Sequence, residues 1–91
     1  MEKVFITWWM GDDNDLNGNF KVNGHECIVG IQKEEVDGNP QAVGLFIHCV
    51  KPYELELIDR VCSTTAEALN VLYNLSVDYV MNLIDIEGSR L

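Results

Sequence analysis

A polar segment close to the N-terminal end has the residue types and the spacing of a calcium-binding loop. Four residues with side-chain oxygens occupy alternate positions in it: Asp13, Asp15, Asn17 and Asn19. Carboxylate and amide oxygens are the ligands that the hard Ca²⁺ ion prefers, and Gly18 would allow the sharp turn that such loops contain. However, Gly24 stands where a bidentate glutamate normally completes these loops. Calcium binding is therefore an alternative to an ordinary solvated loop, which the same residue types favour.

Histidine and cysteine side chains could support either a zinc site or a reactive thiol. His25 and Cys27 precede a turn-rich segment, and His48 and Cys49 follow it, so an antiparallel hairpin brings Cys27 opposite the Cys49 region. Zinc needs about four convergent ligands, whereas His48 and Cys49 point to opposite faces of a strand. A nucleophilic cysteine needs a neighbouring base or a positive environment, and the chain is strongly negative. We expect reduced, buried thiols, with a small thiol enzyme as a second alternative function.

The remaining sequence carries no motif that names a reaction. It has no glycine-rich phosphate loop, no serine elbow and no metalloprotease motif. Neighbouring carboxylates such as Glu54 and Glu56 have the spacing of solvent-facing residues on a strand. We therefore expect a non-enzymatic protein with no catalytic residue and, calcium apart, no cofactor.

Length, composition and charge exclude several classes of protein. The 91 residues are enough for one domain, residues 1–91, because domains commonly contain roughly 100–150 residues. Hydrophobic residues make up 47% of the chain, which is too many for a disordered acidic tail. The net charge of −9 argues against direct binding of nucleic acid. Neither a secretory signal nor an apolar run of membrane-spanning length is present, so we expect a cytoplasmic protein without a membrane partner.

The elements that must position these residues include several short strands. Segments rich in β-branched and aromatic residues, separated by turn signals, predict strands at about 3–10, 20–22, 25–35, 42–50 and 53–61. A polar loop is expected at 11–19, and Asn23-Gly24 predicts a tight hairpin turn. The segment 53–61 alternates between apolar and charged residues, which favours a strand, although Pro52 could also begin a helix. Both faces of the first strand are apolar, as is typical of a central strand or of a strand at an interface.

The C-terminal segment predicts one long helix at about 65–86. Thr64 and Glu67 fit a capping box, no proline or glycine interrupts the segment, and Gly88 follows as a stop. The polar residues form one stripe about 120° wide and the apolar residues span about 200°, whereas a helix on a sheet needs about 100°. The expected fold is α+β, with an antiparallel sheet of three to five strands packed against this helix.

An excess of apolar surface predicts self-association. Trp8 and Trp9 point to opposite faces of a strand, so Trp9 is either covered by segment 11–22 or 53–62 or exposed in an aromatic patch. Exposed patches of this kind commonly mark interaction sites. We expect a homodimer, with contacts from aromatic and apolar residues of the first strand and the helix: Phe5, Trp9, Tyr73, Tyr79 and Ile84.

The surplus of acidic residues predicts a basic protein partner. Between Tyr53 and Glu87, acidic residues are opposed by Arg60 alone. Net charge favours solubility, but an acidic domain can also occupy a surface meant for nucleic acid and gain a faster association rate. Small phage-encoded inhibitors of nucleases and of other defence proteins are similar in size and charge, although no motif links this chain to them. We expect a protein-binding module or inhibitor whose contacts include one tryptophan and several acids: Trp9, Glu54, Glu56, Asp59, Asp78 and Asp85.

Overall fold

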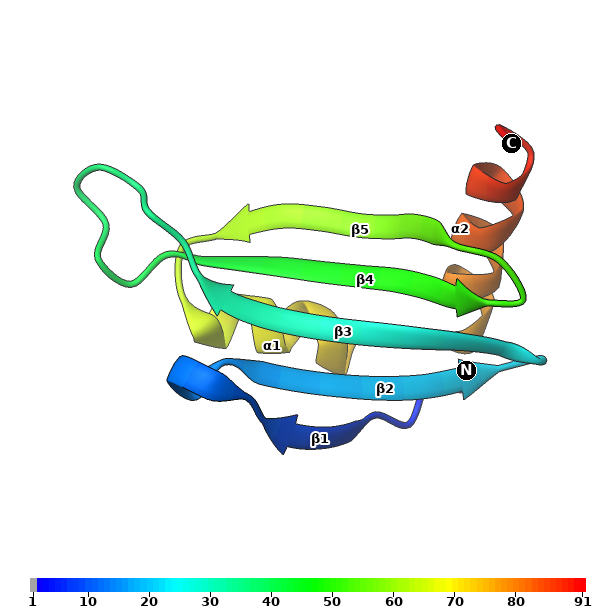
Figure 1. Cartoon of the computed structure of the whole chain (residues 1–91), viewed down its shortest axis with the longest axis horizontal. Coiled ribbons are helices and arrows are strands. Elements are labelled where there is room, and N and C mark those ends of the chain that lie inside the picture. The colour runs from blue at the N-terminus through cyan, green and yellow to red at the C-terminus, as the bar shows by residue number, and fades with distance from the viewer. Residues whose placement is uncertain (1) are drawn as a thin grey trace.

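Five antiparallel strands form one sheet in the order in which they follow one another in the sequence (Figure 1). The computed structural model describes residues 2–91, apart from the side chain of Asn14. Its strands are β1 (Thr7–Met10), β2 (Leu16–Val22), β3 (His25–Lys33), β4 (Val43–Lys51) and β5 (Leu55–Cys62). A 3₁₀ turn (Asp12–Asn14) joins β1 to β2, and two helices, α1 (Thr65–Tyr73) and α2 (Val77–Gly88), follow the sheet. The predicted α+β class and antiparallel sheet are confirmed.

Two hairpins set the register of the central strands. Asn23 and Gly24 have φ values of 45° and 82°, and a two-residue type I′ turn requires positive φ at both positions. β3 and β4 pair along most of their length, and Cys27 lies directly opposite Cys49. The predicted hairpins and the opposition of the two cysteines are therefore confirmed.

The second strand begins earlier in the chain than the sequence predicts. β2 starts at Leu16, so the expected loop at 11–19 is wrong for its last four residues. Asn17 and Asn19 pair with β1 on one side and with β3 on the other, and this pairing on both sides holds a polar segment in an extended form. Among the described strands β1 pairs only with β2, so the first strand lies at the edge of the sheet and not at its centre.

β5 confirms the prediction of a strand rather than a helix, but one irregularity alters its faces. The register with β4 shifts between Ile47 and His48, so β5 contains an extra residue opposite this step. Leu55 and Leu57 are buried, whereas Val61 is 56% exposed. The alternation of apolar and charged residues that predicts this strand places Val61 on the same face as Leu55 and Leu57, and for Val61 this is wrong, because a bulge reverses the alternation beyond it.

Both helices pack on the same face of the sheet (Figure 1). α1 contacts β4 and β5, while α2 contacts β5 and reaches β2 at one end of the sheet. Strands and helices share one apolar core, whose fully buried members include Val29, Leu45, Ile47, Val80 and Ile84. No element within residues 2–91 covers the opposite face of the sheet. Neither of the helices described is long and apolar enough to cross a membrane.

α1 begins as the sequence predicts. The Thr64 hydroxyl accepts a hydrogen bond of 3.1 Å from the backbone N–H of Glu67, and the Glu67 carboxylate accepts one of 2.9 Å from the N–H of Ser63. The bond to Thr64 satisfies an N–H group that the start of a helix leaves without a partner, so the predicted N-cap is confirmed. The second bond differs from a capping box, because Glu67 accepts from Ser63 and not from the N-cap residue itself.

The C-terminal segment forms two helices, so the prediction of one long helix is wrong. The chain bends at Asn74–Ser76, where the N–H of Leu75 donates to the carbonyl of Leu72 and closes the last turn of α1. The Ser76 side chain then accepts a hydrogen bond of 3.1 Å from the N–H of Tyr79 and caps α2. α1 and α2 each turn a different side towards the sheet. The wide apolar arc predicted for one helix is therefore shared by two helices, each of which buries part of it.

The N-terminal segment pairs with this bend. The N–H of Val4 donates to the carbonyl of Leu75 over 3.2 Å, and the N–H of Val77 donates to the carbonyl of Glu2 over 2.9 Å. The end of α1 and the start of α2 contain backbone groups that no helical hydrogen bond satisfies. The segment therefore crosses from the sheet edge to the helical layer and holds the bend in place.

Replacing Ser76 tests the cap of α2. Ser76→Ala removes the acceptor for the N–H of Tyr79, and loss of such a cap typically lowers the free energy of unfolding by about 1 kcal/mol. Ser63→Ala is the control, because Ser63 is exposed and only its backbone takes part in the hydrogen bonds described for it, and changes at such sites usually stay within about 0.5 kcal/mol. Urea denaturation compares the two variants, and equal stabilities would contradict the assignment of the cap.

Candidate functional site

The face of the sheet opposite the helices is uncovered within residues 2–91, and we call it the open face. Directly opposed residues on adjacent antiparallel strands share a face. One row of such residues crosses the open face: Asn17, Gly30, Phe46 and Asp59. The next row lies beside it: Asn19, Ile28, His48 and Glu56. β1 extends the two rows with Trp9 and Thr7, so all five strands contribute to this surface.

The centre of the open face is apolar. Phe46 is half-buried because Gly30, on the neighbouring strand, has no side chain: a Cβ atom at Gly30 would overlap the Phe46 ring. The ring centroid of Phe46 lies 5.1 Å from that of His48, and Ile28 and Val50 are also half-buried. Together these side chains form a low apolar surface, a feature that marks interaction sites on soluble proteins.

Carboxylates border the β5 side of the open face. Glu56 and Asp59 are exposed on β5, and the carboxylate of Glu34 lies over Gly44, where an added Cβ would come within 2.8 Å of its oxygen. The ion pairs found within residues 2–91 involve other acids: Glu26, Glu67 and Glu87. The border therefore presents carboxylates that the described basic residues do not neutralise.

The predicted partner-binding residues do not form one surface. Three of them lie on the open face: Trp9, Glu56 and Asp59. Glu54 directly precedes β5, whereas Asp78 and Asp85 lie on α2 in the other layer. The sequence did not group Phe46 or Glu34 with these residues, because only the strand register places Phe46 on this face and only the approach of the Glu34 carboxylate to Gly44 places Glu34 there.

The predicted self-association residues also separate. Four of them are between 47% and 88% exposed: Phe5, Trp9, Tyr73 and Tyr79. Neither 11–22 nor 53–62 covers Trp9, because β2 and β5 place both segments in the sheet itself. The prediction for Ile84 is wrong, since it is 2% exposed: the bend at Ser76 turns this side of α2 towards the core.

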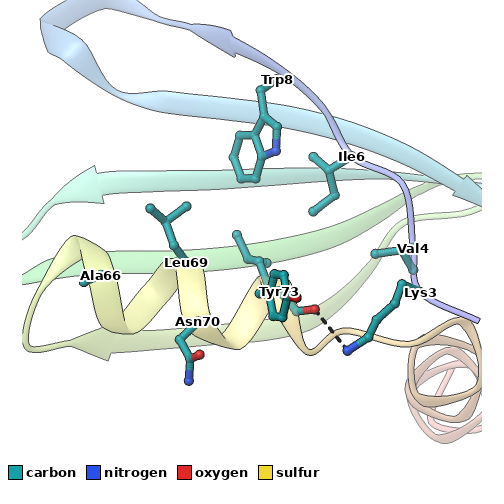
Figure 2. A pocket seen from close by; sticks show the side chains of 9 residues that line it. Lys3, Val4, Ile6, Trp8, Ala66, Leu69, Asn70 and Tyr73 are labelled. Atoms are coloured by element: carbon teal, nitrogen blue, oxygen red, sulfur yellow. Dashed lines mark hydrogen bonds between the residues drawn. The ribbon is translucent and has the colours of Figure 1, made fainter. Parts of the chain in front are cut away.

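A groove lies between the N-terminal segment and α1 (Figure 2). Its volume is about 710 Å³, and most of its lining residues are apolar: Val4, Ile6, Trp8, Ala66, Leu69, Leu72 and Tyr73. Lys3 lies at one end, with Nζ 3.2 Å from the carbonyl oxygen of Tyr73 and 5.3 Å from the centroid of its ring. The sequence does not predict this groove, because nothing local shows that the N-terminal segment crosses to the helices.

The residues of the expected calcium loop are not gathered in one loop. Asp13 is exposed in the 3₁₀ turn, with a φ of 58°, and Asp15 directly precedes β2. Asn17 and Asn19 lie within β2, where alternation places both side chains on the open face. No group of three or more histidine, cysteine, aspartate or glutamate side chains in residues 2–91 is arranged to hold a metal ion.

The three cysteines are buried and form no disulfide bond, as the sequence predicts. Burial, and secondarily the neighbouring Cys49, raise the pKa of the Cys27 thiol from 9.0 to about 12. The Cys49 thiol itself donates a hydrogen bond of 3.3 Å to the carbonyl of Lys51. Nucleophilic cysteines depend on the opposite shift, a lowered pKa, so Cys27 is a protonated core residue at neutral pH.

The raised pKa of Cys27 makes stability depend on pH in alkaline solution. The thiol begins to ionise near pH 9 in the unfolded chain but stays protonated up to about pH 12 in the folded chain, so its contribution to stability is complete below pH 9 and is lost between those values. We expect the melting temperature to fall more steeply over this range in the wild type than in Cys27→Ala. The other titrating groups are common to both proteins, so parallel pH profiles would contradict the shift.

Comparisons with models of known protein families, with curated protein sequences and with solved structures found no significant match for this chain. Its function must therefore be inferred from its own surfaces. Of these, the open face is the one that combines an apolar centre with a charged border.

Proposed function

We propose that this chain is a non-catalytic binding module whose open face covers a basic surface of another protein. In its most specific form, the module is an inhibitor that mimics the charge of nucleic acid and occludes a nucleic-acid-handling or defence protein. The observation that carries the proposal is the open face itself: Phe46 and Trp9 expose apolar surface on it, and the carboxylates of Glu34, Glu56 and Asp59 border it.

The open face has the composition of a protein interface. Interface centres are enriched in aromatic residues and depleted in charge, while their rims are polar. Phe46 lies across Gly30 and against His48, so its ring is already packed before a partner arrives. Preorganised side chains lose less conformational entropy on binding, which favours affinity.

The acidic border favours a partner of opposite charge. A net charge of −9 attracts basic proteins over long range and repels acidic ones. Arg60 is next to Asp59 in sequence but pairs with Glu67 at 3.9 Å. A lysine or arginine of the partner can therefore approach Glu56 and Asp59 without displacing a cation of this chain.

An NMR titration tests where the chain attracts positive charge. Oligolysine is the probe, because it carries charge without a fold of its own. We expect amide shifts to concentrate on β4 and β5 around Glu56 and Asp59, and to fade with added salt, since the Debye length falls from about 30 Å at 0.01 M to about 3 Å at 1 M. Shifts that concentrate on α2 around Asp78 and Asp85 would contradict the proposal.

Two matched double variants distinguish binding at the acidic border of the open face from binding that depends only on the net charge of the chain. Glu56→Gln with Asp59→Asn removes two charges from the open face, and Asp78→Asn with Asp85→Asn removes two from α2. We expect the first pair to weaken oligolysine binding about two- to thirtyfold, because exposed ion pairs contribute about 0.2–1 kcal/mol each and about 1.4 kcal/mol is tenfold. The α2 pair should have a clearly smaller effect. Equal weakening by both pairs would show that only net charge matters and would overturn the proposal.

A further inference from the structure

We propose that β1 is a self-pairing edge, through which two copies of this chain form a dimer with one continuous antiparallel sheet. The proposal does not rest on the function assigned to the open face, although Trp9 belongs to both surfaces. It follows from a difference between the two edges of the sheet, from the position of the exposed apolar residues and from the distribution of charge.

The two edges of the sheet are protected to different degrees. Edge strands expose backbone N–H and C=O groups, and proteins usually guard them with charged residues, proline or a covering element. β5 carries Glu56, Asp59 and Arg60, so charge guards one edge. β1 consists of threonine, two tryptophans and methionine, all of them exposed. Within residues 2–91, the edge strand β1 therefore contains neither a charged residue nor a proline.

Exposed apolar residues concentrate at this unguarded edge. Phe5 is 88% exposed, Trp8 39%, Trp9 47% and Met10 59%. Exposed apolar surface of this kind marks interfaces on soluble proteins, and aromatic residues commonly dominate their binding energy. The first strand is apolar on both faces, as an internal strand would be, and it becomes internal when a second strand pairs with it.

Charge favours a second copy as the occupant of this edge. β1 itself is uncharged, so the repulsion between two copies of net charge −9 is smaller at this edge than at β5, where like charges would be directly opposed. Pairing through β1 places the two acidic β5 borders nine strand spacings apart, about 40 Å, which is several Debye lengths at physiological salt. It also brings the acidic turn after β1, with Asp12 and Asp13, towards the end of the second copy's β1 that Lys3 precedes.

Symmetry restricts the register of such a dimer to two choices near its centre. Two identical strands pair antiparallel about a twofold axis perpendicular to the sheet, and opposed residues then lie on the same face. Trp8 faces the helical side, where it lines the groove, and Trp9 faces the open side. The axis therefore passes between two copies of Trp8 or between two copies of Trp9. Either register forms a cross-strand tryptophan pair, which is stabilising.

Sedimentation equilibrium of the full chain tests the proposal. We expect twice the chain mass of 10.3 kDa at tens of micromolar. Met10→Lys places a charge on β1 at a residue that is 59% exposed, and Val61→Lys places the same charge on β5 at a residue that is 56% exposed. Lysine on an edge strand opposes strand pairing. Met10→Lys should raise the dissociation constant at least tenfold, and Val61→Lys should leave it nearly unchanged.

Several outcomes overturn the proposal. A monomer at every concentration up to the millimolar range does so, and so does a dimer that both lysine variants weaken equally. A dimer that Tyr73→Ser disrupts but Met10→Lys does not would place the interface on α1 and exclude β1.

Dilution of the wild-type protein gives a second measurement that does not depend on the folding of a variant. Dissociation through β1 exposes Trp8 and Trp9, so the tryptophan emission should shift to longer wavelength with the same midpoint as the change in mass. Emission that stays constant while the mass halves overturns the proposal.

Discussion

Two backbone hydrogen bonds between the N-terminal segment and the helical layer determine how the rest of the chain is arranged. The N–H of Val4 donates to Leu75, and the N–H of Val77 donates to Glu2. Backbone groups at helix ends and bends are costly to leave without partners, since each unsatisfied buried group costs roughly 1–3 kcal/mol. Because the N-terminal segment satisfies them, the C-terminal residues can bend into two helices that both cover one face of the sheet. The other face stays open.

The same crossing of the N-terminal segment produces two exposed surfaces of different character. The open face combines an apolar centre at Phe46 with the acidic border of Glu56 and Asp59, which suits a basic partner. The edge strand β1 is uncharged and apolar on both faces, which suits an identical strand. Pairing through β1 leaves both open faces on the same side of the joined sheet, and two linked sites bind a partner with two matching surfaces more tightly than either site alone.

Local sequence signals predicted the parts of the fold that depend on neighbouring residues. Asn23-Gly24 gave the turn of the first hairpin, and Thr64 with Glu67 gave the start of α1, because in each case the interacting groups are close in sequence. The start of β2 and the bend between the helices depend instead on backbone partners far along the chain. The prediction that Ile84 contributes to self-association is wrong for the same reason, because the bend between the helices turns Ile84 towards the core. For the candidate site, the sequence singled out Trp9, Glu56 and Asp59 individually, but only the strand register shows that they share a face with Phe46.

The most direct test of whether the N-terminal segment holds the helical layer in place compares amide hydrogen exchange in Val4→Pro with that in Val4→Ala. Both substitutions remove the valine side chain, but only proline removes the N–H that donates to Leu75. Leaving a buried carbonyl without its donor costs about 1–3 kcal/mol. We therefore predict that exchange in β1 and in the first turn of α2 is about tenfold faster or more in Val4→Pro than in Val4→Ala. Equal exchange in the two variants would contradict the claim that this pairing holds the helical layer in place.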